Sequence, residues 1–214
     1  MPPQHIVEGD VDRLIETTFF RDFKGPGVFV DVGAARPDYL SISSHFRNRG
    51  WRVIAVEPNP EFAKLYREKG YEVHEFACGA QDQDDVEFQV VNSHGGAYLG
   101  GEVSYESFSS LKIKPEYARL KSDLDITNIR VNMRRLDTIL RDCAKVDRID
   151  ALSVDVEGWE LEVMQGFDTS KYAPKVIVLE NIFSDPRYRS ALQQVGYAFS
   201  GNIAPNDIFV RIAP

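Results

Sequence analysis

Short apolar runs alternate with amphipathic stretches along most of the chain. Near-continuous apolar runs, such as residues 28–32 and 176–179, are typical of strands that are buried on both faces. Residues 86–91 instead alternate charged and apolar positions, which predicts a strand with one solvated face. The pattern as a whole predicts strands over residues 28–32, 52–57, 72–76, 86–91, 129–134, 149–156, 176–180, 197–200 and 208–212.

Helical stretches lie between these strands and are marked by their end signals. Asn59 and Pro60 are typical of a helix start, and Gly50, Gly70 and Gly196 are typical of helix ends. Strands that alternate with helices predict an α/β fold with a parallel sheet and right-handed crossovers. Helices are therefore predicted over residues 43–49, 61–69, 137–143, 159–165 and 186–195.

The length of 214 residues favours one domain over residues 1–214. Residues 1–24 are expected to form a helical lead-in. Residues 92–128 are the least regular stretch, with a short helix expected near 115–121. A loop of this length is typical of a lid or binding loop, or else of disorder, and we favour the lid.

Composition limits the class of protein. The chain is 43% hydrophobic and 27% charged, with a net charge of −8, so it should fold and stay in solution. An acidic chain is a poor general binder of nucleic acid, which needs a basic face. We expect no membrane span and no signal peptide, and therefore a cytoplasmic protein. Cys78 and Cys143 are expected to be buried, reduced thiols.

The residues with candidate chemistry stand where predicted strands end. Ligands of open parallel sheets bind beyond the carboxyl ends of the strands. We expect these ends to share one edge of the sheet, although a carboxylate at such a place can also cap a helix. The strand ends read Asp31-Val32-Gly33-Ala34, Glu57-Pro58-Asn59, Ala77-Cys78-Gly79, Asp155-Val156-Glu157 and Glu180-Asn181.

Glu57 and Gly33 predict a ligand of the adenosine type. An acidic residue that closes the second strand can accept hydrogen bonds from both ribose hydroxyls, and a glycine lets the backbone approach the ligand. A dinucleotide site prefers three glycines, whereas the loop here has one, followed by Pro37. Asp31 would also repel a pyrophosphate. These features favour S-adenosylmethionine, with an NAD-dependent oxidoreductase as the alternative.

Several segments together resemble the FkbM-type methyltransferases. The resemblance runs in order from about residue 28 to residue 180, and its most specific element is Asp155-Val-Glu-Gly-Trp-Glu160. The loop after Ala34 departs from most relatives by the intervening Arg36 and Pro37. The other matching segments are Phe29–Ala34, Gly50-Trp51, Val56–Pro60, Arg135–Asp137 and Leu179-Glu180.

The resemblance implies a Rossmann-like class I methyltransferase fold, a mostly parallel seven-stranded sheet with helices on both faces. It implies S-adenosylmethionine as the methyl donor and a hydroxyl of a sugar, glycan or natural product as the acceptor. Asp155 and Glu157 would face the region of methyl transfer. The residues that would contact the cofactor are Asp31, Gly33, Ala34, Glu57, Pro58, Asn59, Ala77, Cys78 and Asp155.

An alcohol must lose a proton as it is methylated, and a nearby carboxylate can assist as a general base. Asp155 is the first candidate for the catalytic base, Glu157 the second and Glu180 the third. Glu157 has the alternative of capping the following helix. A Mg²⁺ ion held by these three carboxylates is a further alternative, although no metal is our main expectation. Trp159 is expected to pack in the core, with stacking on a sugar as the alternative.

The acceptor cannot be identified from these residues. The predicted acceptor loops are 92–128 and 181–188, and residues 112–135 are locally basic, which leaves a nucleotide sugar open as the partner. A non-catalytic module that only binds S-adenosylmethionine is a third class of function. The oligomeric state is not predicted.

Overall fold

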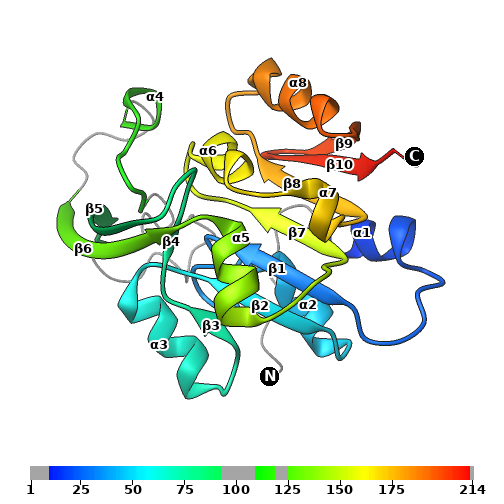
Figure 1. The fold of residues 1–214 in the computed structure, drawn as a ribbon, viewed down its shortest axis with the longest axis horizontal. Helices are drawn as coiled ribbons and strands as arrows, with labels where there is room; N and C mark the ends of the chain where they lie inside the picture. Colours follow the sequence, from blue (N-terminus) through cyan, green and yellow to red (C-terminus); the bar gives the residue numbers. More distant parts are fainter. Residues whose placement is uncertain (1–9, 93–108, 119–124, 213–214) are drawn as a thin grey trace.

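The structure is a computed structural model that describes residues 10–92, 109–118 and 125–212. Within these residues, a seven-stranded sheet has the order β3-β2-β1-β7-β8-β10-β9 (Figure 1). Its strands, in chain order, are β1 (Val28–Val32), β2 (Arg52–Val56), β3 (Val73–His74), β7 (Ala151–Val154), β8 (Val176–Glu180), β9 (Tyr197–Ile203) and β10 (Asn206–Arg211).

Strand pairing in this sheet is parallel from β3 to β8 and antiparallel on both sides of β10. The chain reverses direction in the sheet at β1, where β2 lies on one side and β7 on the other. Such a switch point leaves a crevice at the carboxyl ends of the strands. The predicted fold class, a mostly parallel seven-stranded sheet with helices on both faces, is confirmed.

Helices cover both faces because successive strand residues point to opposite sides. Phe29 and Val53 face a core shared with α1 (Val11–Phe19) and α2 (Ile42–Asn48). Val30 and Ile54 face a larger core on the other side. The helical elements on that side are α5 (Leu136–Thr138), the π-helix Ile139–Ala144, α6 (Glu160–Gln165), α7 (Thr169–Tyr172) and α8 (Pro186–Gln194).

A second sheet lies beside the first. Within the described residues it has three strands in the order β4-β6-β5, with bounds Ala77–Cys78, Ile126–Arg134 and Gln83–Val91. The expectation that Ala77-Cys78 closes a strand of the main sheet is therefore wrong, because this segment pairs with β6. Pairing between segments far apart in the chain is decided by packing, which local patterns do not report.

Several element ends agree with the predicted signals. Asn59 caps α3 (Pro60–Glu68), since its side chain accepts a hydrogen bond from the Glu61 amide, and Gly70 follows with a left-handed φ of 69°. The helix expected near 115–121 is α4 (Pro115–Ala118). Residues 93–108 and 119–124 of the expected lid lie outside the described residues, as do residues 1–9 of the lead-in, whose described part includes α1.

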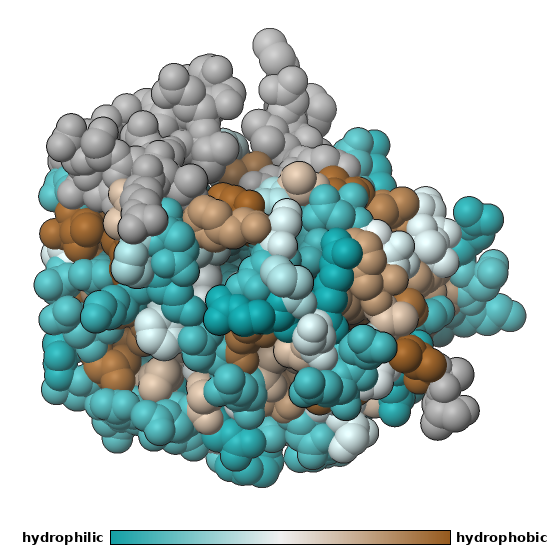
Figure 2. Space-filling model, turned by 90° about the horizontal axis from the view of Figure 1, so that it is seen from above, coloured by the Kyte–Doolittle hydropathy of each residue, from teal (hydrophilic) through white to brown (hydrophobic). Residues whose placement is uncertain are grey.

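The surface and the cysteines complete the comparison. The face drawn in Figure 2 is mostly hydrophilic, with smaller hydrophobic patches between. Cys78 is buried, but Cys143 is exposed, so the expectation of two buried thiols is wrong for Cys143. It lies in the π-helix, whose outer side faces solvent. Among the described residues, no helix has both the length and the apolar character that a membrane crossing requires.

Candidate functional site

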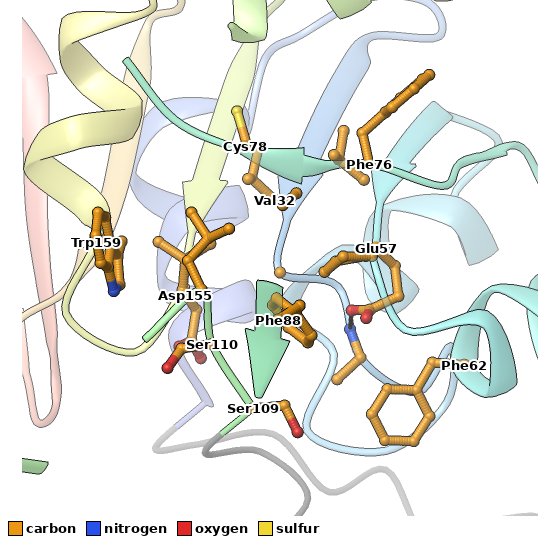
Figure 3. A pocket seen from close by; sticks show the side chains of 17 residues that line it. Val32, Glu57, Phe62, Phe76, Cys78, Phe88, Ser109, Ser110, Asp155 and Trp159 are labelled. Atoms are coloured by element: carbon orange, nitrogen blue, oxygen red, sulfur yellow. Dashed lines mark hydrogen bonds between the residues drawn. The ribbon is translucent and has the colours of Figure 1, made fainter. Parts of the chain in front are cut away.

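A cavity lies beyond the carboxyl ends of β1, β2 and β7 and opens to solvent. Figure 3 shows Glu57 and Phe62 on one side of this cavity and Asp155 and Trp159 on the other. Among the predicted cofactor contacts, those that line it are Gly33, Glu57, Pro58, Ala77, Cys78 and Asp155.

Glu57 is a buried carboxylate at the end of β2, with 4% of its surface exposed. Oε2 accepts a hydrogen bond from the Ala35 amide at 2.8 Å, and Oε1 accepts one from the Asn59 amide at 2.7 Å. Burial raises the pKa of Glu57 to about 7, against the lowering effect of these hydrogen bonds. Each oxygen retains acceptor capacity, so the carboxylate can accept two further hydroxyl hydrogens.

The turn after β1 uses its backbone amides internally. The amides of Gly33 and Ala34 both donate to the carbonyl of Val56, at 2.9 and 3.3 Å, and the Ala35 amide donates to Glu57. A pyrophosphate needs free amides at such a turn, and a helix that begins there. These three amides are already bonded, and α2 begins only at Ile42.

Gly33 is required for a reason other than the one expected. Its φ is +78°, and a Cβ atom at this position would lie 1.7 Å from the carbonyl oxygen of Asp155. The close approach that the glycine permits is therefore between the ends of β1 and β7. The glycine shapes the cavity by bringing these strand ends together, whatever the ligand.

Three predicted cofactor contacts, Asp31, Ala34 and Asn59, do not line the cavity. Asp31 accepts a 2.5 Å hydrogen bond from the hydroxyl of Ser43, and burial raises the pKa of this carboxyl. The Ala34 carbonyl accepts a hydrogen bond from Tyr66 at 2.8 Å. Asn59 caps α3. These three residues therefore stabilise the loops next to the cavity and do not line it.

Asp155, Glu157 and Glu180 come together at the ends of β7 and β8. One carboxylate oxygen from each lies within 4.8 Å of the other two. Glu157 and Glu180 are about 95% buried. Like charges this close repel in a buried place, which favours a shared proton or a bound cation. The three predicted catalytic carboxylates therefore form one cluster.

Glu160, which we did not single out from the sequence, organises the turn that carries Asp155 and Glu157. Its Oε1 accepts hydrogen bonds from the amides of Val156 and Gly158, both at 3.0 Å. Its Oε2 accepts one from the hydroxyl of Tyr188 at 2.5 Å. The side chain is fully buried, and burial raises the pKa of Glu160. The signal available in the sequence was a glutamate in the first turn of the helix predicted over residues 159–165.

The backbone of this turn is in an uncommon conformation. Glu157 has a φ of +56°, a left-handed value that is rare for a residue with a side chain, and Gly158 follows with +94°. In an extended segment the side chains of residues 155 and 157 would point the same way. The turn is bent instead, and the carboxylates converge because Glu160 holds the bend.

Residues 109–118, here called the strap, cross from β5 to this turn. The carbonyl of Lys112 accepts a hydrogen bond from the Trp159 indole at 3.0 Å. The Lys114 ammonium donates hydrogen bonds to the carbonyl of Gly158 and to the side-chain carboxylate of Glu162. It also lies 5.0 Å from the centre of the Trp159 ring. Trp159 is therefore held in place at the cavity wall, half-buried and not deep in the core as we expected.

Tyr117 of the strap covers the carboxylate cluster. It is 4% exposed, and a Cβ atom on Gly158 would lie 2.6 Å from its ring. Burial, together with the neighbouring carboxylates of Glu160, Glu180 and Glu157, raises the pKa of Tyr117 far above its ordinary value. The described part of the predicted lid is thus in contact with the site.

The sheet order and the acidic strand ends are those of a Rossmann-like α/β domain with a ligand site at the carboxyl ends of its strands. The chain belongs to a particular family of such domains, because the family model described as "Methyltransferase FkbM domain" matches residues 31–199. This confirms the predicted family. It also agrees with the predicted class of enzyme, a methyltransferase.

Individual relatives are distant. "Methyltransferase 1" of Beauveria bassiana (strain ARSEF 2860) is 24% identical over 123 residues, which are 54% of this chain and 49% of that protein. The chain thus spans about half the length of this curated relative.

Two solved structures are similar at low sequence identity. One is the precorrin-6y C5,15-methyltransferase of Geobacter metallireducens GS-15, with a TM-score of 0.49, 13% identity and coverage of 99% of this chain and 92% of that one. The other is the methyltransferase domain of the bacterial CtHen1-C protein, with a TM-score of 0.41, 14% identity and 96% coverage of both chains.

Proposed function

We propose that this protein is an S-adenosylmethionine-dependent O-methyltransferase that acts on a hydroxyl of a sugar, glycan or natural product. The observation that carries the proposal is that one cavity joins the buried carboxylate of Glu57 to the carboxylate of Asp155. The first suits the ribose of an adenosine-type cofactor, and the second suits an alcohol that loses its proton. Membership of the FkbM family supports both assignments.

The cavity fits S-adenosylmethionine by its donor and acceptor groups. Glu57 would accept hydrogen bonds from the ribose hydroxyls, and apolar side chains beside it, Phe62 and Phe76, would flank the adenine. An acidic rim is compatible with a sulfonium cofactor. When bound, the cofactor supplies an electrophilic methyl group.

The residues of the carboxylate cluster would hold and deprotonate the acceptor. Asp155 lines the cavity and is our first candidate for the base that takes the hydroxyl proton. Glu157 and Glu180, buried beside it, would keep that proton within the cluster or orient the hydroxyl. The chain's main contribution is to hold the oxygen in line with the methyl group, which is a positioning task.

In a second possible mechanism the same cluster binds a divalent cation. One carboxylate oxygen from each of its three residues lies within 4.8 Å of the other two, which favours such binding. Mg²⁺ would lower the pKa of a bound hydroxyl in place of a base. Dialysis against EDTA followed by a turnover assay separates the two mechanisms. We propose the metal-free one, which retains its turnover after dialysis.

The acceptor we propose carries little negative charge at its reacting end. Three of the cations in the locally basic stretch 112–135, namely Lys114, Arg130 and Arg134, are paired with Glu162, Asp85 and Asp84 respectively. The cavity end near Asp155 is acidic. A nucleotide sugar remains a candidate if its phosphates lie away from the cluster.

There are two alternative functions: an NAD-dependent oxidoreductase, and a module that binds the cofactor without turnover. The bonded amides of the turn after β1 speak against the first, because a pyrophosphate finds no donors among them. Transfer of tritium from S-[methyl-³H]adenosylmethionine to a panel of sugars and glycosides tests the second. Label in the acceptor supports the proposal, and cofactor binding without transfer to any acceptor supports the module.

A further inference from the structure

The strap is fixed to β5 by paired hydrogen bonds on either side of Ser110. The Ser110 amide donates a hydrogen bond to the Gln89 carbonyl at 3.0 Å, and the Gln89 amide donates one to the Ser110 carbonyl at 2.8 Å. The hydroxyl oxygen of Ser109 accepts a hydrogen bond from the Val91 amide at 3.0 Å. The Ile113 amide donates to the Gln89 side chain at 2.8 Å. The backbone of Ser110 is therefore held in a single place.

The side chain of Ser110 is an exception to this pattern. It is 2% exposed, and in the described part of the chain it is the one buried hydroxyl whose oxygen has no hydrogen-bond partner. It also lines the cavity that contains Glu57 and Asp155 (Figure 3). A buried hydroxyl without a partner destabilises a fold, so nearly all such groups are bonded to protein, water or ligand.

We infer that Ser110 is a ligand-binding residue, whose hydroxyl hydrogen-bonds S-adenosylmethionine in the cavity. The inference rests on the proposed function. The hydrogen bonds of the backbone to β5 keep the Ser110 side chain at the cavity wall. The main sheet and the strap would thus hold the cofactor from opposite sides. The strap also reaches the turn beside Asp155 through Lys112 and Lys114, so it adjoins both the cofactor and the catalytic cluster.

The inference predicts effects of opposite sign on binding and on stability. In Ser110→Ala, the dissociation constant for S-adenosylhomocysteine, measured by calorimetry, should rise about tenfold because one hydrogen bond is lost. The melting temperature of the ligand-free protein should rise by about 2 °C, because an unsatisfied buried group has been removed. Ser110→Cys keeps the shape with a weaker donor and should lie between wild type and Ser110→Ala in both measurements.

Ser44→Ala is the matched control. The hydroxyl of Ser44 is buried away from the cavity and donates to the Ser41 carbonyl at 2.9 Å. This substitution should lower the melting temperature and leave binding unchanged. For Ser110→Ala, unchanged binding means that the hydroxyl holds an ordered water only, and a lower melting temperature means a structural role; either result overturns the inference while the proposed function stands. A wild type that binds no S-adenosylhomocysteine overturns both.

Discussion

The hydroxyl of Tyr188 donates a 2.5 Å hydrogen bond to the carboxylate of Glu160, and both side chains are buried. The bond joins α8 to the first residue of α6. Glu160 also accepts hydrogen bonds from the amides of Val156 and Gly158. The turn that carries Asp155 and Glu157, two of the three candidate catalytic residues, is therefore held by one buried glutamate. The site is therefore supported from the core.

Tyr188→Phe should destabilise the protein by about 2 kcal/mol, since it leaves a buried carboxylate oxygen without its donor. Turnover should fall further than S-adenosylhomocysteine binding, because the carboxylates lose their alignment while Glu57 is untouched. Tyr197→Phe is the control, since the buried hydroxyl of Tyr197 donates to the Pro174 carbonyl and neither residue lines the cavity. Urea unfolding and the tritium-transfer assay measure the two effects. Equal loss of turnover in both variants would contradict this account of Glu160.

Gly33→Ala should destabilise the protein by more than about 3 kcal/mol. The added Cβ would overlap the Asp155 carbonyl, and the strand ends would have to separate. Gly50→Ala is a close control, because Gly50 has a similar φ of +82° and open space around it. The free energy of unfolding of Gly50→Ala should fall by only about 1 kcal/mol, which is the cost of a left-handed φ for alanine. Denaturant midpoints of the two variants measure their losses of stability. Similar losses would mean that the positive φ alone, and not the contact with Asp155, accounts for a glycine at position 33.

Glu57 should make stability depend on pH. The pKa of about 7 in the folded protein lies above the ordinary 4.5, so the folded state holds the proton more tightly than the unfolded state. This contribution is fully present below about pH 4.5 and is lost as the pH rises through about 7. The full difference corresponds to about 3 kcal/mol. The unfolding free energy of wild type relative to Glu57→Gln should therefore fall between pH 5 and pH 8; a constant difference would refute the raised pKa.

Asp155→Asn should lose most turnover and keep cofactor affinity within about tenfold. The amide preserves the shape of the side chain but cannot take a proton from the acceptor. Glu162→Gln, on the adjacent helix and paired with Lys114, is the control for a change of charge near the site. The tritium-transfer assay and calorimetry provide the two values. Unchanged turnover in Asp155→Asn would remove Asp155 from the role of base.

Local sequence signals predicted the helix ends, because a few neighbouring residues determine where a helix begins and ends. The Asn59-Pro60 start and the Gly70 end of α3 depend on capping and left-handed backbone, which a few residues determine. The meeting of Asp155 and Glu180 followed from the rule that parallel strands end at one edge of the sheet. Burial on both faces, read from the apolar runs, gave the class of fold.

Long-range contacts explain the rest. Nothing near Glu160 in the chain indicates that Tyr188 is its partner, so the role of Glu160 was missed. The reason for Gly33 depends on Asp155, more than a hundred residues away. The pairing of Ala77-Cys78 with β6 and the contacts of the strap with Trp159 are likewise tertiary. Such contacts need the fold before they can be stated.

The central claim is that the cavity at Glu57 binds S-adenosylmethionine. Calorimetric titration of wild type and Glu57→Ala with S-adenosylmethionine, S-adenosylhomocysteine and NAD⁺ tests it most directly. We predict that wild type binds the first two and not NAD⁺, and that Glu57→Ala weakens both by at least about tenfold, since two ribose hydrogen bonds are lost. A wild type that binds NAD⁺ but neither S-adenosyl compound would contradict the account.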